Sequence, residues 1–111
     1  MSDNVIEIDA SRYEAEVLKS AVPVVLDFYS TECPPCEALA PKFESVAEAY
    51  AGRARFVKVF RQGNRELAQQ LGVTGSPTLV FFKGGAEVGE RMSGEEIKKT
   101  AIKAQVEAML G

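Results

Sequence analysis

A continuous apolar run near the start of the chain limits the possible folds more than any other feature. It covers residues 22–29, reads VPVVLDFY, and contains one acid, Asp27. A strand with one solvated face alternates apolar and polar residues, whereas a strand covered on both faces is apolar along its length. The run therefore predicts a strand inside a sheet that has helices on both faces.

Helical and strand patterns alternate along the rest of the chain. The apolar spacing predicts further strands over residues 5–8, 54–60, 78–83 and 87–92. It predicts helices over residues 10–20, 34–50, 64–71 and 95–110. Strands separated by helices imply parallel pairs with right-handed crossovers, and Gly84-Gly85 between the last two strands indicates an antiparallel hairpin. We predict an α/β fold, a mixed sheet of about five strands flanked by four helices, as a single domain over residues 1–111.

Local signals accompany three of the predicted helices. Asp9 or Ser11 can cap the first, and Asn64 can cap the third, because short polar side chains accept hydrogen bonds from free first-turn N–H groups. Pro41 lies inside the second helix, where it cannot donate to the preceding turn. We expect a kink there.

Charge and hydropathy exclude several classes of partner. Thirteen basic residues stand against sixteen acidic ones, for a net charge of −3, and the basic residues are scattered. This pattern is not typical of nucleic-acid binding. The chain shows neither a secretory leader nor an apolar stretch of the roughly 20 residues that span a bilayer. We expect a cytoplasmic protein without membrane or nucleic-acid partners.

Both cysteines of the chain lie in one short motif, Cys33-Pro34-Pro35-Cys36. A stable structural disulfide is disfavoured in a reducing cytosol, so the C-x-x-C spacing favours redox or metal chemistry. Zinc would require carboxylates or a second molecule, because the chain has no histidine. Two unconnected buried cysteines are the other alternative, but burial does not explain the proline spacer. The motif therefore favours a redox pair, without a metal or other cofactor.

The predicted start of the second helix places this pair at a helix N-terminus. Free N–H groups and the helix dipole favour a thiolate there and lower the pKa of a cysteine. Glu32 and Glu37 add negative charge, and Pro34 and Pro35 offer no N–H donor, so these residues oppose ionisation. The two effects act in opposite directions, and we predict a partly activated Cys33 thiol.

Four separated segments together resemble the thioredoxin family over nearly the whole chain. They are "VVLDFYSTECPPCEALAPKF", "VKVF", "GVTGSPTLVFFKGG" and the order of the predicted helices. A lone C-x-x-C would be weak support. Its combination with T-x-x-P-T and with an acid six residues upstream of Cys33 makes the resemblance specific. The resemblance implies the thioredoxin fold and a thiol–disulfide oxidoreductase.

The resemblance also implies a role for four residues. Cys33 would attack a substrate disulfide, and Cys36 would then attack Cys33 and release reduced substrate. Asp27 matches the family's buried acid, which helps to take the proton from the second thiol. Lys58 matches the lysine near that acid. The alternatives are a structural acid bonded to backbone and an edge lysine whose amine reaches solvent.

A second group of residues would contact the substrate. Pro77 matches the family's proline that follows a cis peptide bond and faces the cysteines. Beside it, Ser76 would offer backbone groups to an extended substrate in the manner of strand addition. The remaining predicted contacts are Gly75 in the same loop and Glu32, Pro34 and Pro35 around the cysteines.

The sequence departs from the family pattern around this predicted groove. Glu32 stands where the family usually has tryptophan, Glu37 replaces a basic residue, Ser76 replaces an apolar residue, and Gln62 replaces an acid within "FRQGNR". Pro34-Pro35 replaces Gly-Pro. These changes remove apolar surface and predict an acidic rim, so we hypothesise a narrower set of partners with basic or polar surroundings.

Three functions remain open at this point. The first is a monomeric reductase of protein disulfides, with a thioredoxin-reductase-type protein as electron donor. The second is a disulfide oxidant or isomerase, because the dipeptide between the cysteines tunes the reduction potential. The third is a binding module that keeps the fold while its redox activity is incidental.

Overall fold

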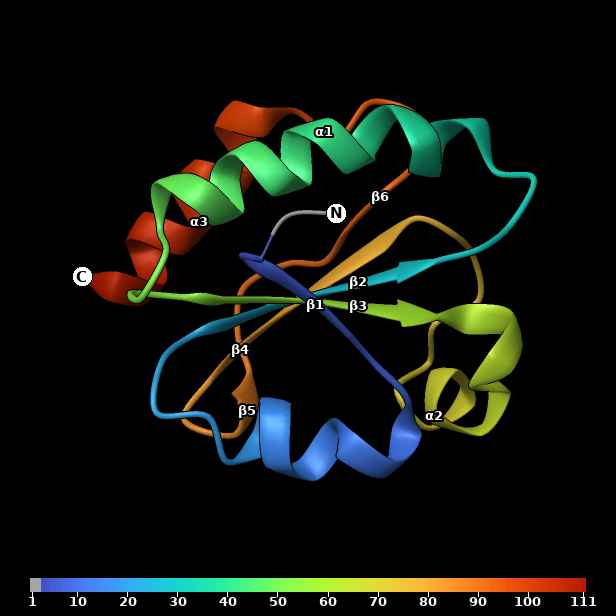
Figure 1. Ribbon diagram of the computed structural model, residues 1–111, viewed down its shortest axis with the longest axis horizontal. Helices are drawn as coiled ribbons and strands as arrows, with labels where there is room; N and C mark the ends of the chain where they lie inside the picture. The colour runs from blue at the N-terminus through green and yellow to red at the C-terminus, as the bar shows by residue number, and fades with distance from the viewer. Residues whose placement is uncertain (1–2) are drawn as a thin grey trace.

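The structure of the protein is a computed structural model, which describes residues 3–111. Its centre is a mixed sheet, shown in Figure 1, whose strands follow the order β1-β3-β2-β4-β5, with β6 paired to β4. The strand bounds are Val5–Ile8 (β1), Val24–Tyr29 (β2), Arg55–Phe60 (β3), Thr78–Lys83 (β4), Ala86–Glu87 (β5) and Met92–Ser93 (β6). The helix bounds are Pro34–Ala49 (α1), Arg65–Gln70 (α2) and Lys99–Leu110 (α3).

Helices cover both faces of the sheet, as the apolar run over residues 22–29 predicted. In Figure 1, α1 and α3 lie above the sheet, and α2 and the N-terminal helical segment lie below it. Each face has its own apolar core. The core under α1 and α3 includes Val25, Phe43, Phe56, Phe81 and Ile102, and the opposite core includes Val17, Leu26, Phe28, Val57 and Phe82.

The strand β2 lies at the centre of the sheet. It pairs with β3 in parallel and with β4 antiparallel, so that Asp27 lies opposite Lys58 on one side and opposite Leu79 on the other. Side chains alternate between the two faces of a strand. Asp27 therefore shares the face of Val25, which packs under α1, and this face leads to the N-terminus of that helix.

Three predicted segments differ in detail from the structure. The first helix, predicted over 10–20, is a 3-10 turn at Ala10–Arg12 followed by a short π-helix at Glu14–Leu18. The strand predicted over 87–92 is broken into β5 and β6, with Gly89 between them at a φ of 69°. The last helix begins at Lys99 rather than at residue 95.

The capping predictions have mixed outcomes. The Ser11 N–H donates to Asp9 Oδ1 at 2.9 Å, so Asp9 is the cap of the first turn. Asn64 precedes α2 but makes no side-chain capping bond. Its Oδ1 accepts from the Ala10 N–H at 2.9 Å, and its Nδ2 donates to the Phe60 carbonyl at 2.9 Å. Asn64 therefore ties two distant segments together instead of capping its own helix.

Candidate active site

The two cysteines lie where the chain leaves β2 and enters α1. Cys33 is the residue that caps α1, with Pro34 and Pro35 in the first helical turn. First-turn residues have no intrahelical partner for their N–H groups, so prolines are tolerated there. The Cys33–Cys36 disulfide is closed, and the Cα atoms are 5.2 Å apart. This arrangement confirms the prediction that both sulfurs meet at a helix N-terminus.

The helix end supplies one direct contact to the first sulfur. The Cys36 N–H donates to Cys33 Sγ over 3.2 Å. An N–H donor at this position stabilises negative charge on sulfur once the disulfide opens. Cys33 and Cys36 are 8% and 9% exposed, so only a small part of each is open to a partner.

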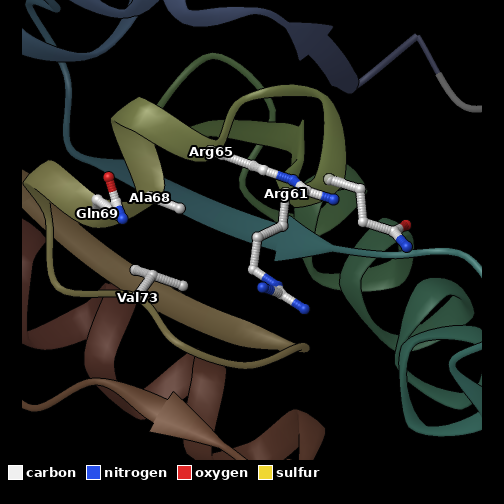
Figure 2. A pocket seen from close by; sticks show the side chains of 6 residues that line it. Arg61, Arg65, Ala68, Gln69 and Val73 are labelled. Carbon is white, nitrogen blue, oxygen red and sulfur yellow. The ribbon is translucent and has the colours of Figure 1, made fainter.

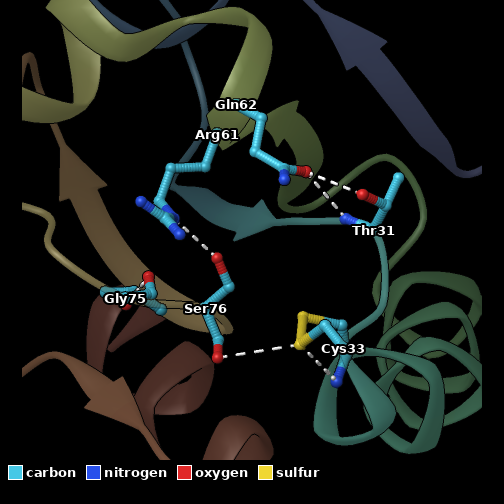
Figure 3. Close-up of a disulfide and its surroundings, with 8 residues drawn as sticks. Thr31, Cys33, Arg61, Gln62, Gly75 and Ser76 are labelled. Carbon is cyan, nitrogen blue, oxygen red and sulfur yellow. Dashed lines mark hydrogen bonds between the residues drawn. A yellow bond between two sulfur atoms is a disulfide. The ribbon is translucent and has the colours of Figure 1, made fainter.

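The loop that precedes β4 faces the disulfide, as Figure 3 shows. The Ser76–Pro77 peptide bond is cis, as the resemblance implied. Cys33 Sγ lies 3.7 Å from the Ser76 carbonyl oxygen, and the Thr78 hydroxyl donates to the Gly75 carbonyl at 2.9 Å within the same loop. Gly75, Ser76 and Pro77 thus adjoin the sulfur that the resemblance makes the attacking one.

Asp27 lies on the face of the sheet that α1 covers. It is 4% exposed, and its Oδ1 has no hydrogen-bond partner within residues 3–111. Burial raises the pKa of this carboxyl to about 7, and the positive charge of Lys58 opposes part of that rise. Asp27 also lines a pocket of about 320 Å³ together with Cys36, Glu32 and Lys58. The pocket places the buried acid and the second cysteine in one open space.

Lys58 is half-buried on β3, directly across from Asp27. Its Nζ lies 4.6 Å from the centre of the Tyr29 ring, a distance typical of a cation–π contact. The Tyr29 hydroxyl donates to Glu7, whose strand position is paired with Lys58. Burial, followed by the bond to Glu7, raises the pKa of Tyr29 above its ordinary value. Lys58 therefore lies in register between Glu7 and Asp27, contacts the Tyr29 ring, and lowers the pKa of Asp27 through its positive charge.

The rim of the site includes contacts that the sequence did not predict. The Arg61 Nε donates to the Ser76 hydroxyl at 2.8 Å, on the far side of Ser76 from the disulfide (Figure 3). Gln62 Oε1 accepts from the Thr31 N–H at 2.9 Å and from the Thr31 hydroxyl at 3.0 Å. The only sequence signal for these contacts was the basic segment "FRQGNR", which does not show where its side chains point.

The predicted acidic rim is therefore only one side of the site. Glu32 and Glu37 are exposed and line the pocket beside Cys36, and Glu32 has a φ of 52°. Pro34 is exposed and Pro35 is half-buried at the tip of α1. Arg61 lies on the other side of the Ser76 loop. Two exposed acids therefore lie beside Cys36, with Lys58 in the same pocket, and an arginine lies beyond the Ser76 loop.

Two further observations concern cofactors and membranes. Within residues 3–111, no group of three or more His, Cys, Asp or Glu side chains is placed to hold a metal ion. In the same part of the chain, no helix has the length and apolar character needed to cross a bilayer.

A closed C-x-x-C disulfide at a helix N-terminus, a facing proline loop and a buried acid next to the second cysteine define a class of protein. Such a site exchanges a dithiol for a disulfide, and the protein is a thiol–disulfide oxidoreductase.

Comparisons with known proteins define the family. The Thioredoxin family model matches residues 4–108. "Thioredoxin 1" of Nostoc sp. is 40% identical over 82 residues, which are 74% of this chain and 77% of the relative. "Thioredoxin" of Peptoclostridium acidaminophilum is 36% identical over 111 residues, which cover 99% of this chain and 96% of the relative. "Thioredoxin X, chloroplastic" of Arabidopsis thaliana is 34% identical over 94% of this chain and 57% of its own length. The chain belongs to the thioredoxin family.

Proposed function

We propose that the protein reduces disulfides of other proteins through its Cys33/Cys36 couple. The Cys33 thiolate attacks a substrate disulfide, which breaks the substrate S–S bond and forms a mixed disulfide, and the released substrate thiolate takes up a proton. Cys36 then loses its proton and attacks Cys33 Sγ, which closes the Cys33–Cys36 bond and releases the second substrate thiolate. Two electrons pass from the protein to the substrate.

Asp27 is the proposed acceptor of the Cys36 proton. The observation that carries this role is its unpartnered Oδ1 in the pocket that it shares with Cys36. A pKa of about 7 suits a group that accepts and returns a proton near neutral pH. Lys58, across the strand pair, is proposed as a positioning residue that limits the rise of this pKa through its charge.

Substrate binding is proposed at the loop that faces Cys33. The Ser76 backbone would pair with an extended substrate segment, with Gly75 and Pro77 shaping the approach. Glu32, Pro34 and Pro35 would contact the substrate on the α1 side. The distance of 3.7 Å between Cys33 Sγ and the Ser76 oxygen supports this placement, because a segment bound at Ser76 lies next to the attacking sulfur.

The proposed setting follows from the sequence. Residues 1–111 would act as one thioredoxin-like domain and as a monomer in the cytoplasm, in electron transport and redox homeostasis. A thioredoxin-reductase-type protein would return electrons to the disulfide, and no bound cofactor, membrane or nucleic acid would take part. The scattered basic residues and the net charge of −3 support the last point.

Turnover of a protein disulfide tests the proposal. Insulin reduction with dithiothreitol as electron donor would be followed for the wild type and for Cys33→Ser. The wild type should accelerate the reaction, and the variant should match the uncatalysed rate, because it lacks the sulfur that adjoins the Ser76 loop and attacks the substrate. Equal rates for the two proteins would favour the binding module instead.

The direction of electron flow has its own measurement. Equilibration of the Cys33/Cys36 couple with glutathione gives its reduction potential. A value near about −270 mV is typical of a reductant, whereas about −180 mV or above is typical of an isomerase or oxidant. Capture of partners with Cys36→Ser, which cannot release the mixed disulfide, would identify the substrates and the electron donor.

A further inference from the structure

Arg61 lies next to the disulfide site but has no role in the disulfide exchange described above. It follows β3 directly and is half-buried. Its Nε bonds to the hydroxyl of Ser76, whose carbonyl oxygen lies 3.7 Å from Cys33 Sγ. A single residue thus separates the guanidinium from the sulfur at which a substrate would be attached.

The same arginine opens onto a pocket of about 340 Å³ between α2 and the loop that precedes β4 (Figure 2). Four of its six lining residues are polar or charged, and two are apolar. Its lining residues are Arg61, Gln62, Arg65, Ala68, Gln69 and Val73. Two of these side chains carry positive charge and none carries negative charge, so the pocket is suited to an anion.

The two arginines have donors to spare. Within residues 3–111, neither forms an ion pair, and the bond to Ser76 is the only hydrogen bond that the Arg61 side chain makes. The bond through Nε fixes the orientation of the planar Arg61 guanidinium, and its two terminal nitrogens remain available as hydrogen-bond donors. A guanidinium fixed in this way can bind a carboxylate with two parallel hydrogen bonds.

We propose that this pocket is a specificity subsite for an acidic side chain of the polypeptide substrate, close to the substrate's reactive cysteine. Arg61 would bind the carboxylate directly, and Arg65 would add positive charge at the mouth of the pocket. The inference rests on the proposed function, because it assumes that a disulfide substrate occupies the Ser76 loop.

The geometry sets where the acid should lie in the substrate. An extended chain advances about 3.3 Å per residue, and residues two apart point to the same side. A segment paired with Ser76 that places its cysteine at Cys33 carries its next same-side residue past the Ser76 hydroxyl, toward Arg61. The expected acid is therefore a glutamate or aspartate within two residues of the cysteine.

A pair of synthetic disulfide peptides tests the proposal. The two would differ only in Glu or Gln at the position two residues from the attacked cysteine, and kcat/KM for their reduction would be measured with dithiothreitol as donor. The wild type should prefer the Glu peptide by about twofold to fivefold, the size expected for a partly exposed ion pair. The preference should fall toward one as salt is raised, since exposed charges are screened.

Variants assign the preference to the arginine. Arg61→Gln should bring the ratio of kcat/KM for the Glu peptide to that for the Gln peptide close to one. Arg61→Lys, which keeps the charge but loses the planar guanidinium, should give an intermediate ratio. Lys83→Gln makes the same charge change at an exposed position at the far end of β4 and should keep the wild-type ratio. A third peptide, with Lys in place of Glu, should have the lowest kcat/KM of the three with the wild type. This comparison requires no variant of the protein.

Several outcomes would overturn the subsite. A wild-type ratio near one, or an unchanged ratio in Arg61→Gln, would do so. An Arg61-dependent preference seen with the small diacid disulfide 3,3′-dithiodipropionate but not with the peptides would assign the pocket to free anions instead. Calorimetry of the oxidised protein with the same peptides, their cysteines replaced by serine, measures binding without disulfide exchange. If the subsite exists, the Glu peptide should bind more tightly than the Gln peptide in this assay, even if the protein were to reduce neither disulfide peptide.

Discussion

Replacement of Asp27 by asparagine should make the protein more stable at alkaline pH while it slows disulfide exchange. In the unfolded chain an aspartate ionises near its ordinary pKa of 3.8, but in the folded protein burial raises the pKa to about 7. Between these values the unfolded state has lost its proton while the folded state keeps it, so the stability of the wild type falls as pH rises. Each pH unit corresponds to about 1.4 kcal/mol, which gives a loss of about 4 kcal/mol above pH 7.

Asparagine has nearly the same shape and does not ionise in this range. At low pH, the difference in unfolding free energy between Asp27→Asn and the wild type reflects only altered packing and hydrogen bonds. The change of this difference with pH reflects the ionisation of Asp27. Relative to the wild type, Asp27→Asn should therefore gain about 3 kcal/mol between about pH 4.5 and about pH 8, the part of the titration window that this interval covers.

Urea unfolding of the oxidised proteins at a series of pH values measures this difference, because the closed disulfide keeps both cysteines from titrating. Asp3→Asn makes the same exchange at an exposed position and serves as the control. If the stability difference between Asp27→Asn and the wild type did not change with pH, the carboxyl would not have a raised pKa. Its role as proton acceptor near neutral pH would then lose its physical basis.

Three further predictions concern the core, the scaffold and the rim. Phe43→Ala should lower the free energy of unfolding by about 3–5 kcal/mol in urea titrations, because Phe43 is 1% exposed in the core under α1; a loss below 1 kcal/mol would contradict this packing. Asn64→Ala should cost about 1–2 kcal/mol, since it leaves the Ala10 N–H and the Phe60 carbonyl without their side-chain partner; unchanged unfolding would mean that water replaces both bonds. Glu32→Trp should widen the range of reduced protein disulfides, because aromatic side chains contribute much of the binding energy at interfaces. Unchanged rates across a substrate panel would count against that reasoning.

The sequence predicted the parts of the fold where one pattern dominates. The apolar run of β2 and the helical spacing of α1 left little choice, because each must bury a long apolar surface. The last helix was predicted four residues too early. Ile97 fits the helical spacing and is buried, but it lies in a non-helical segment whose carbonyl accepts from Lys42 Nζ at 3.3 Å. The periodicity of apolar residues indicates which residues are buried, but it does not determine whether the backbone at those residues is helical.

The candidate site was predictable to a similar extent. Cys33, Cys36 and Pro77 stand in short motifs, and the structure brings all three together. The Arg61 contact was not predictable from the sequence, because it joins the end of β3 to a loop fifteen residues later and depends on the direction of one long side chain. The positive charge beside the Ser76 loop follows from this contact and could not be predicted from the count of charges.

The pairing of β2 with β4 has a consequence for engineering this protein. Phe28 lies opposite Thr78, so the two segments that carry the disulfide and the proline loop are joined by main-chain hydrogen bonds immediately behind both. Main-chain bonds do not depend on side-chain identity. The residues around the disulfide and the proline loop can therefore be exchanged in combinatorial libraries while the distance between these two segments is maintained. Substrate specificity can then be changed without altering the cysteines that exchange electrons.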